Sequence, residues 1–335
     1  MRYRIAVLSG GRSSEREISL ASARSVAGAL SARGAEVISI EIGRGGQWAL
    51  GPPATDDTPG TELAMRLPGR AVVQMLGEAD VVFPVLHGPF GEDGTVQGLL
   101  ELADLPYVGA GVAASAIAMD KDLFKSLLRA KEIPVTRHET LLAGEAPRNP
   151  YGYPVFVKPA RLGSSVGISK AHDEAELEAA VALAFRHDEK VLVEEFVDGI
   201  EVEVGVLGNL APVASVPGEI VVAHNEWYDY EAKYEEGEME LLIPARISPA
   251  QSARAQELAV QAFSAAGCEG MARVDMFVSS GGEVLVNELN TIPGFTETSV
   301  YATLFETSGI GYGELLERLV ELALERHERR RRLLY

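Results

Sequence analysis

Four polar side chains in the last quarter of the chain have the residue types and the spacing of a metal and phosphate site. Arg273 and Asp275 lie two residues apart in an apolar, β-prone run, and Glu288 and Asn290 lie two apart in an alternating run. A Ser-Ser-Gly-Gly turn at 279–282 joins the runs. Residues two apart on a strand share a face. Antiparallel pairing across the turn therefore predicts that Asp275, Glu288 and Asn290 form a set of three oxygen ligands, with the guanidinium beside them.

Oxygen ligands with no nearby Cys or His favour Mg²⁺ or Mn²⁺ over zinc. Magnesium commonly shares its coordination sphere with substrate phosphates, so such a site indicates a nucleotide. The Asn-Thr-Ile-Pro-Gly-Phe-Thr segment that follows contains Gly294, and a glycine lets backbone amides approach a ligand closely. The alternative interpretation is a surface hairpin with solvated carboxylates.

The composition limits the class of protein. The 335 residues suit two or three domains, and 47% hydrophobic with 24% charged residues indicate a globular chain. A net charge of −19 opposes non-specific binding to nucleic acid. No apolar run approaches the length that spans a membrane, and the N-terminus is expected to be a first strand rather than a signal peptide. The single cysteine, Cys268, fits a reducing cytoplasm.

The first part of the chain alternates strands and helices as a doubly wound α/β domain does. Strands are expected at 4–8 and 36–40, with a helix at 15–33 between them. The glycine-rich loop before the helix lacks the G-x-G-x-x-G spacing, which argues against a nicotinamide site. Glu15 stands where the loop becomes the helix. It is either an acid favoured by the helix dipole or a residue facing the strand ends where ligands bind.

His87 follows the next expected strand, at 80–86. This histidine could act as a base, contact a substrate or hydrogen-bond within its loop. Because the sequence shows no partner for it, ordering of the loop is the favoured role. Glu92 and Asp93 precede an expected helix at 95–103, and the sequence predicts ordinary N-terminal acids there.

Two further stretches have the character of phosphate-binding segments. Lys158 lies within an apolar strand at 154–159, where a lysine is costly unless an anion pairs with it. The Gly/Ser loop 160–167 can fold over phosphates through backbone amides, although it is not a Walker A sequence. The segment 225–237 is polar and aromatic, which favours an ordered lid, and Lys233 is its one cation.

These patterns predict three regions. They are an N-terminal α/β domain at 1–120, a central subdomain at 121–210, and a C-terminal catalytic subdomain at 211–335 with the lid loop at 225–240. The closing helix is expected at 314–326, and the basic tail at 325–335 is expected to be the frayed, solvated end of this helix.

Eight motifs follow one another over almost the whole chain. They are GGRSSEREIS, LHGPFGEDGTVQG, MDK, VKPARLGSSVGISK, VEEFVDGIEVEV, YDYEAKY, ARVDMF and NELNTIPGFTETS. Together and at these spacings they resemble the D-alanine–D-alanine ligase family of the ATP-grasp superfamily. Arg16 stands where the family pattern has histidine, and Ala302 where it has proline; neither position carries chemistry. The resemblance implies an α/β, three-domain ATP-grasp architecture, with a doubly wound parallel-sheet domain followed by two α+β subdomains that clasp ATP.

The residues that the resemblance places around ATP divide into phosphate contacts, an adenine pocket and a ribose contact. Lys121, Lys158 and Lys233 would contact the phosphates. Segment 194–197 would line the adenine, and Glu201 would hold the ribose. The implied ATP-binding set is Lys121, Lys158, Glu194, Glu195, Phe196, Val197, Glu201, Lys233, Phe277, Asn287 and Glu288.

The resemblance also implies roles at the metal and amino-acid sites. Asp275, Glu288 and Asn290 would bind two Mg²⁺ or Mn²⁺ ions. Glu15 would bind the ammonium group of the first D-alanine, His87 would contact substrate, and Ser299 would hold the carboxylate of the second D-alanine. Ser164 and Tyr234 would link with Glu15 to close the lid. Arg273 and the Gly294 amide would form the oxyanion hole.

The implied activity is the ATP-dependent joining of two D-alanines through an acylphosphate, for peptidoglycan synthesis and hence for the cell wall and cell shape. ATP would be a substrate, the location cytoplasmic and the assembly a homodimer, with no nucleic-acid or membrane partner. The resemblance implies that a tyrosine at position 234 indicates a dipeptide product. The alternatives are another ATP-grasp carboxylate–amine ligase, such as a D-alanine–D-lactate ligase, and a non-catalytic nucleotide-binding module. The second alternative leaves Arg273 and Ser299 without a role.

Overall fold

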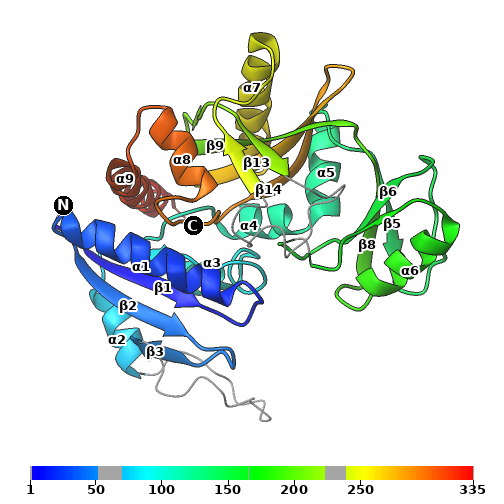
Figure 1. Ribbon diagram of the computed structural model, residues 1–335. Helices are drawn as coiled ribbons and strands as arrows, with labels where there is room; N and C mark the ends of the chain where they lie inside the picture. Colours follow the sequence, from blue (N-terminus) through cyan, green and yellow to red (C-terminus); the bar gives the residue numbers. More distant parts are fainter. Residues whose placement is uncertain (1, 52–69, 165, 223–238, 335) are drawn as a thin grey trace.

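The computed structural model describes residues 2–51, 70–164, 166–222 and 239–334. The described elements form three groups, and each is built on its own sheet (Figure 1). Within the described residues, none of the helices is both long enough and apolar enough to cross a bilayer.

The N-terminal group is a four-stranded sheet with helices on both faces. Its strand order is β3-β2-β1-β4, and β1 runs parallel to β2 and to β4. Apolar residues of β1 and β4 pack on α1 on one face and on α2 and α3 on the other. The predicted doubly wound opening is confirmed. The elements are β1 (Arg4–Gly10), α1 (Arg16–Ala32), β2 (Glu36–Ile42), β3 (Trp48–Leu50), α2 (Arg70–Glu78), β4 (Val81–Pro84) and α3 (Thr95–Leu102).

The central group is an antiparallel sheet of order β5-β8-β6-β7 with one helix on it. Leu177, Val181 and Ala184 of α6 pack on strand residues such as Val155 and Val193. The loop that joins β6 to β7 is the Gly/Ser loop. The elements are β5 (His138–Leu142), β6 (Val155–Pro159), β7 (Ser169–Ala171), α6 (Glu174–Ala184) and β8 (Lys190–Glu195).

The C-terminal group is a six-stranded sheet that contains the predicted hairpin. The path is β12-β11-β9-β13-β14, with β10 paired to β9. One face carries α7 with α4 and α5, and the other carries α8 and α9. The elements are α4 (Val112–Met119), α5 (Lys121–Ala130), β9 (Gly199–Gly208), β10 (Val213–Ala214), β11 (Gly218–Val222), β12 (Met239–Leu242), α7 (Pro249–Ala265), β13 (Gly270–Ser279), β14 (Val284–Asn290), α8 (Val300–Thr307) and α9 (Tyr312–Arg331).

Strand β9 lies before the domain limit that the sequence indicates at 210. It pairs with β13 along its whole length, from Gly270 opposite Gly208 to Ser279 opposite Gly199, and so belongs to the C-terminal sheet. Helices α4 and α5 likewise pack with α7. The limits at 120 and 210 stay a prediction.

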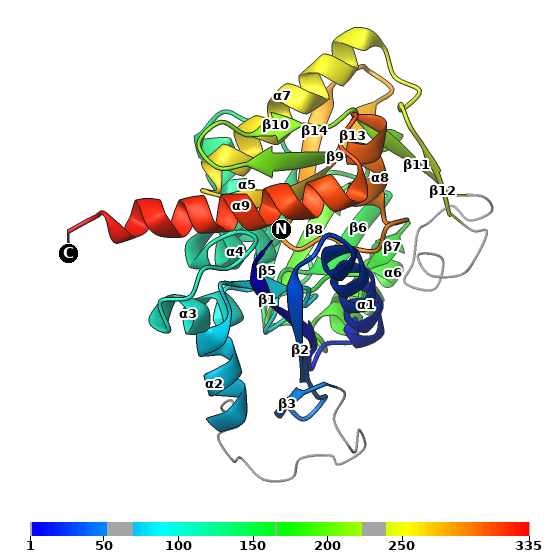
Figure 2. The same cartoon turned by 90° about the vertical axis from the view of Figure 1, so that its left-hand side faces the viewer.

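Helix α9 lies between the N-terminal and C-terminal groups (Figure 2). Leu315, Leu319 and Val320 share one apolar core with Ile5 of β1 and Met271 of β13. The helix continues to Arg331, so the expectation of a frayed tail is wrong. Arg326 is only 3% exposed, and its guanidinium donates to the carbonyl oxygens of residues 107 (2.7 Å) and 109.

Candidate active site

The hairpin of β13 and β14 brings the predicted oxygen ligands together. Arg273 pairs with Asn290 and Asp275 with Glu288 across the two strands, and a β-bulge follows Asp275. The Arg273 guanidinium donates to both Asp275 carboxylate oxygens, each at 2.7 Å. The Asn290 amide also donates to Asp275 (2.9 Å). Glu203 on β9 provides a second carboxylate for Arg273, at 3.1 Å.

The donor chemistry of this set fits a hard divalent cation, since every donor is an oxygen. The set comprises two carboxylates and one amide. It therefore contains only two Asp or Glu side chains, and no group of three or more His, Cys, Asp or Glu side chains able to hold a metal is found among the described residues. Glu288 lies 3.2 Å from the Lys121 ammonium. An ion held by Asp275 would replace one of the hydrogen bonds that this carboxylate now accepts, and a rotation of the Asn290 amide would present its oxygen.

Lys158 has the anionic partner that its place within an apolar strand requires. Its ammonium lies 2.5 Å from Glu194 Oε2 and donates to Asn287 Oδ1 (3.2 Å). Burial alone would raise the pKa of Glu194, but the charges of Lys125 and Lys158 outweigh burial and lower the pKa to about 2. Glu194 is therefore a carboxylate at neutral pH. Lys121, also buried, donates to the Leu162 carbonyl oxygen at the start of the Gly/Ser loop (2.8 Å).

The predicted adenine and ribose residues lie where β8 leads into β9. The Glu195 carboxylate accepts from the Arg137 side chain (2.7 Å). Phe196 is 39% exposed, and the Lys170 ammonium lies 4.7 Å from the centre of its ring. Glu201 and Phe277 are opposite each other on β9 and β13. Val197, half-buried, precedes β9. This edge thus presents an aromatic ring and carboxylates beside the buried Lys158.

Glu15 lies where two loops from distant parts of the chain meet. The Ser164 hydroxyl donates to its carboxylate. A Cβ at Gly88, which has φ +70°, would lie 2.6 Å from Glu15 Oε2, so this approach requires a glycine. The structure thus places Glu15 and Ser164 in contact, as the family resemblance implies. Tyr234 and Lys233 lie outside the described residues.

His87 and Glu92 tie the N-terminal domain to the loop after the hairpin. His87 is buried, its Nδ1 donates to the Ile292 carbonyl oxygen (2.9 Å), and burial lowers the pKa of its imidazole. Glu92 accepts from the Gly88 amide (2.7 Å) and the Ile292 amide (3.2 Å). Burial and the charge of Glu15 raise the pKa of Glu92 to about 8. Glu92 is therefore not the ordinary N-terminal acid expected, whereas Asp93 does accept the Thr95 amide at the start of α3 (3.0 Å).

A row of serines on α1 holds the loops around the site. Ser19, Ser22 and Ser25 are three residues apart and so lie along one side of the helix. Ser19 accepts from the Gly10 amide at the end of β1 (2.8 Å). Ser22 accepts from the Phe295 amide (3.1 Å), next to Gly294.

Ser25 accepts from the Glu297 amide (3.2 Å), and its hydroxyl is 3.0 Å from that of Tyr312. Ser299, at the N-terminus of α8, donates to the Thr296 carbonyl oxygen (2.7 Å). The segment that carries Gly294 and Ser299 is therefore fixed to α1 at two backbone amides.

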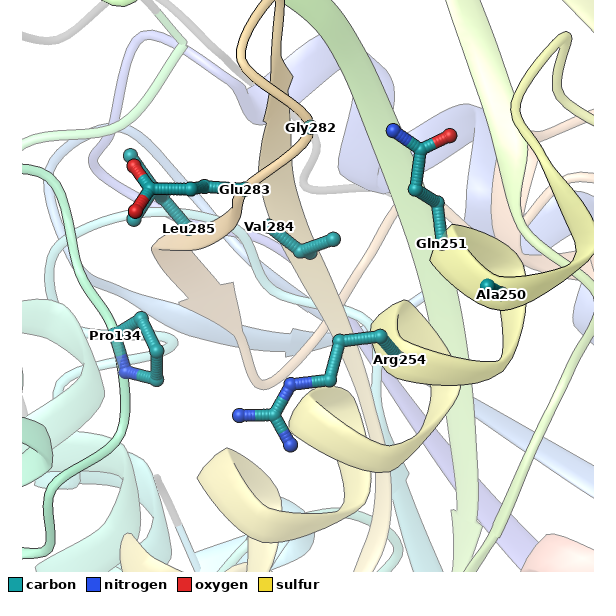
Figure 3. A pocket seen from close by; sticks show the side chains of 8 residues that line it. All are labelled: Pro134, Ala250, Gln251, Arg254, Gly282, Glu283, Val284 and Leu285. Atoms are coloured by element: carbon teal, nitrogen blue, oxygen red, sulfur yellow. The ribbon is translucent and has the colours of Figure 1, made fainter.

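A separate cavity of about 370 Å³ lies at the outer end of the hairpin (Figure 3). Side chains of α7 line one side and the hairpin turn lines the other. None of the predicted site residues borders it. The lining residues are Pro134, Ala250, Gln251, Arg254, Gly282, Glu283, Val284 and Leu285.

Three sheets in this order, with buried lysines and carboxylates gathered between the central and C-terminal sheets, are the architecture of the ATP-grasp class of enzymes. The family described as D-ala D-ala ligase N-terminus matches residues 4–110, and D-ala D-ala ligase C-terminus matches residues 127–321. The chain belongs to the D-alanine–D-alanine ligase family, so the resemblance seen in its motifs is confirmed.

Relatives match the chain over its full length. A D-alanine–D-alanine ligase of Geobacillus thermodenitrificans (strain NG80-2) is 45% identical, and the match covers 100% of this chain and 99% of the relative. One from Solibacter usitatus (strain Ellin6076) is 47% identical, with 98% of each chain covered.

Two solved structures have the same fold. The D-alanine–D-alanine ligase from Coxiella burnetii has a TM-score of 0.83 and 37% identity, with 98% of this chain and 96% of that chain covered. The VanG D-Ala:D-Ser ligase from Enterococcus faecalis has a TM-score of 0.81 and 36% identity, with 96% and 100% covered.

Proposed function

We propose that this ATP-dependent ligase joins two molecules of D-alanine into D-alanyl-D-alanine through an acylphosphate. The observation that carries the proposal is the contact of Glu15 with Ser164, beside His87 and Glu92, on which the charges of both Glu15 and Arg273 act, in a chain whose N-terminal and C-terminal parts both match the family. ATP is a substrate in this proposal, and the location is the cytoplasm, where the dipeptide supplies peptidoglycan synthesis.

The first D-alanine binds with its ammonium on Glu15. The contact from Ser164 fixes this carboxylate from one side, and the Gly88 loop approaches it from another. His87 and Glu92 hold that loop against residue 292, so the first substrate is oriented by groups that are themselves hydrogen-bonded.

Lys121 and Lys158 bind the phosphates and neutralise charge on the transferring group. Asp275, Glu288 and Asn290 are the residues that would hold two Mg²⁺ or Mn²⁺ ions. Such ions, when bound, neutralise charge on the phosphates. Glu194–Val197 and Glu201 would position the adenosine, which sets the γ-phosphate against the carboxylate of the first D-alanine.

The amine of the second D-alanine attacks the acylphosphate carbonyl, and a tetrahedral oxyanion forms. The Arg273 guanidinium and the Gly294 amide stabilise this charge. The second carboxylate binds at Ser299, where the N-terminus of α8 favours an anion. Phosphate then leaves and takes up the proton that the amine loses, and the peptide bond is complete.

Water hydrolyses acylphosphates, so the site must exclude it. The Gly/Ser loop at 160–167 covers one side, since Ser164 and the Leu162 carbonyl contact Glu15 and Lys121. The proposed lid at 225–240, with Lys233 and Tyr234, would cover the other; residues 225–238 of it lie outside the described residues.

The test is product analysis on the purified protein with ATP and Mg²⁺. D-Alanine alone should give D-alanyl-D-alanine, with one ADP for each dipeptide. With D-lactate or D-serine also present at neutral pH, the D-alanine dipeptide should remain the main product. Predominant depsipeptide, or a predominant D-alanyl-D-serine product, would overturn the D-alanine assignment. ATP binding without turnover would instead support a nucleotide-binding module.

The proposed homodimer is tested by light scattering coupled to size-exclusion chromatography. A mass near twice 35.8 kDa supports it, and a mass near 35.8 kDa overturns it.

A further inference from the structure

Lys125 on α5 is a fully buried lysine to which the proposed mechanism gives no role. Its exposed fraction is 0%. Its ammonium donates to the Thr136 hydroxyl, to Glu194 Oε1 and to Asn287 Oδ1 (3.3 Å). A buried ammonium without partners is very unfavourable, so these three acceptors explain how it is tolerated. These acceptors do not explain why a lysine, and not an apolar residue, occupies this buried position on α5.

Lys125 and Lys158 share the same two acceptors. Glu194 gives Oε1 to Lys125 and Oε2 to Lys158, the latter at 2.5 Å. Asn287 Oδ1 accepts from both ammonium groups, at 3.3 Å and 3.2 Å. The four side chains therefore form a closed ring of hydrogen bonds.

The ring joins two of the three sheet groups. Lys158 and Glu194 belong to β6 and β8 of the central sheet. Asn287 lies on β14, and Lys125 lies on the helix α5 that packs with the C-terminal sheet. The proposed nucleotide site lies at this same junction, so the ring sets how Lys158 is aimed relative to the hairpin.

The number of N–H donors on the Lys158 ammonium explains why a second lysine, Lys125, is present. An ammonium group has three N–H donors. Two of those on Lys158 go to Glu194 and Asn287, which leaves one for a phosphate oxygen. Without Lys125, Glu194 Oε1 would lose its buried partner and would compete for that third donor. Burial lowers the pKa of Lys125 to about 7, so its effect on Lys158 depends on its hydrogen bonds to Glu194 and Asn287 and not on a full charge.

We infer that Lys125 is a positioning residue for ATP: by occupying Glu194 Oε1 and Asn287 Oδ1, it keeps the Lys158 ammonium aimed at the phosphates. This inference rests on the proposed role of Lys158 in ATP binding. It does not depend on which amino acid is the second substrate.

The test is a cycle of four proteins: wild type, Lys125→Met, Glu194→Gln and the double variant. The Kd for Mg-ATP is measured by calorimetric titration, and the KM values for ATP and D-alanine are measured separately. Lys125→Met should weaken ATP binding by about 10-fold or more, with the D-alanine KM within about 2-fold of wild type. In the Glu194→Gln background, the same substitution should change the ATP Kd by less than about 2-fold, since Lys125 acts through this carboxylate.

Lys131→Met is the matched control, because this lysine is exposed and follows α5 directly. It should leave the ATP Kd unchanged. An unchanged ATP Kd in folded Lys125→Met, or effects that multiply fully in the double variant, would overturn the inference. If Lys125→Met does not fold, the double variant, which has no charge at either position, is compared with Glu194→Gln. The calorimetric Kd remains measurable even where no dipeptide forms, so failure of the proposed function is seen separately.

Discussion

Replacing Asp275 by asparagine perturbs the proposed metal set with little change of shape. The carboxylate is 3% exposed, and it accepts two hydrogen bonds from Arg273 and one from Asn290. Asparagine retains one oxygen and loses the charge. We expect the Asp275→Asn protein to fold and to lose ATP turnover.

The expected loss of stability follows from the partners of Arg273, and the expected fall in kcat follows from the loss of a metal ligand. Removing one partner of a buried ion pair costs about 3–5 kcal/mol when the other charge is left alone. Glu203 remains 3.1 Å from Arg273, so we expect a stability loss nearer about 1–3 kcal/mol. Loss of a metal ligand removes charge stabilisation from the phosphoryl transfer itself, so kcat should fall by at least about 100-fold.

Glu203→Gln is the matched control, because it also removes one negative charge from beside Arg273 and leaves the proposed ligands in place. Its kcat should stay within about 10-fold of wild type. Turnover is measured by ADP release and folding by circular dichroism. Equal losses in the two variants would show that Asp275 acts only on Arg273, and near-normal turnover in Asp275→Asn would remove it from the metal site.

Three further substitutions test the groups that hold the site. Ser22→Ala leaves the buried Phe295 amide without its acceptor, a loss of about 1–3 kcal/mol, so the KM for the second D-alanine should rise by up to roughly 150-fold at an unchanged ATP KM. Gly88→Ala places a methyl group 2.6 Å from Glu15 Oε2 at φ +70°, so steady-state kinetics should show a higher KM for the first D-alanine. Glu92 has a folded pKa of about 8, above its ordinary 4.5, so its stabilisation is full below pH 4.5 and is lost as the pH rises through 8. Glu92→Gln should therefore flatten the fall in melting temperature between pH 5 and 8.

Matched controls exist on α1 for the first two variants. Ser31 is exposed on the same helix, and Ser31→Ala should leave both KM values unchanged. Gly28 has open space at its Cβ position, so Gly28→Ala should leave activity unchanged. A Ser22→Ala protein with wild-type KM values would show that α1 does not position the loop. If the melting temperatures of wild type and Glu92→Gln fall by the same amount between pH 5 and 8, Glu92 does not titrate as described.

The central hairpin could be predicted because its signals are local. The alternation of residues and the Ser-Ser-Gly-Gly turn fix which side chains share a face, and the structure has Asp275 opposite Glu288. The β-bulge after Asp275 was not predictable, since nothing in the local pattern marks it. Membership of β9 in the C-terminal sheet depends on pairing with β13, some 70 residues further along the chain.

Residues whose role depends on distant partners were missed or misjudged. Lys125 sits on an amphipathic helix, where a lysine is ordinarily solvated, and it is buried by partners 69 and 162 residues away. Glu92 matches the local rule for a helix N-terminus, but one of its two amide donors is 200 residues distant. The basic composition of 325–335 predicts a frayed tail, but Arg326 is buried by acceptors that lie 217 and 219 residues earlier in the chain. Sequence motifs located the site, whereas the groups that support it required the fold.

The most direct test of the central claim is the stoichiometry of one reaction mixture. Purified protein is incubated with Mg-ATP and either D-alanine or L-alanine, and ADP, phosphate and dipeptide are quantified by mass spectrometry. We predict one ADP, one phosphate and one D-alanyl-D-alanine per turnover from D-alanine, and no dipeptide from L-alanine. Release of ADP without dipeptide, or equal yields from the two enantiomers, would contradict the account.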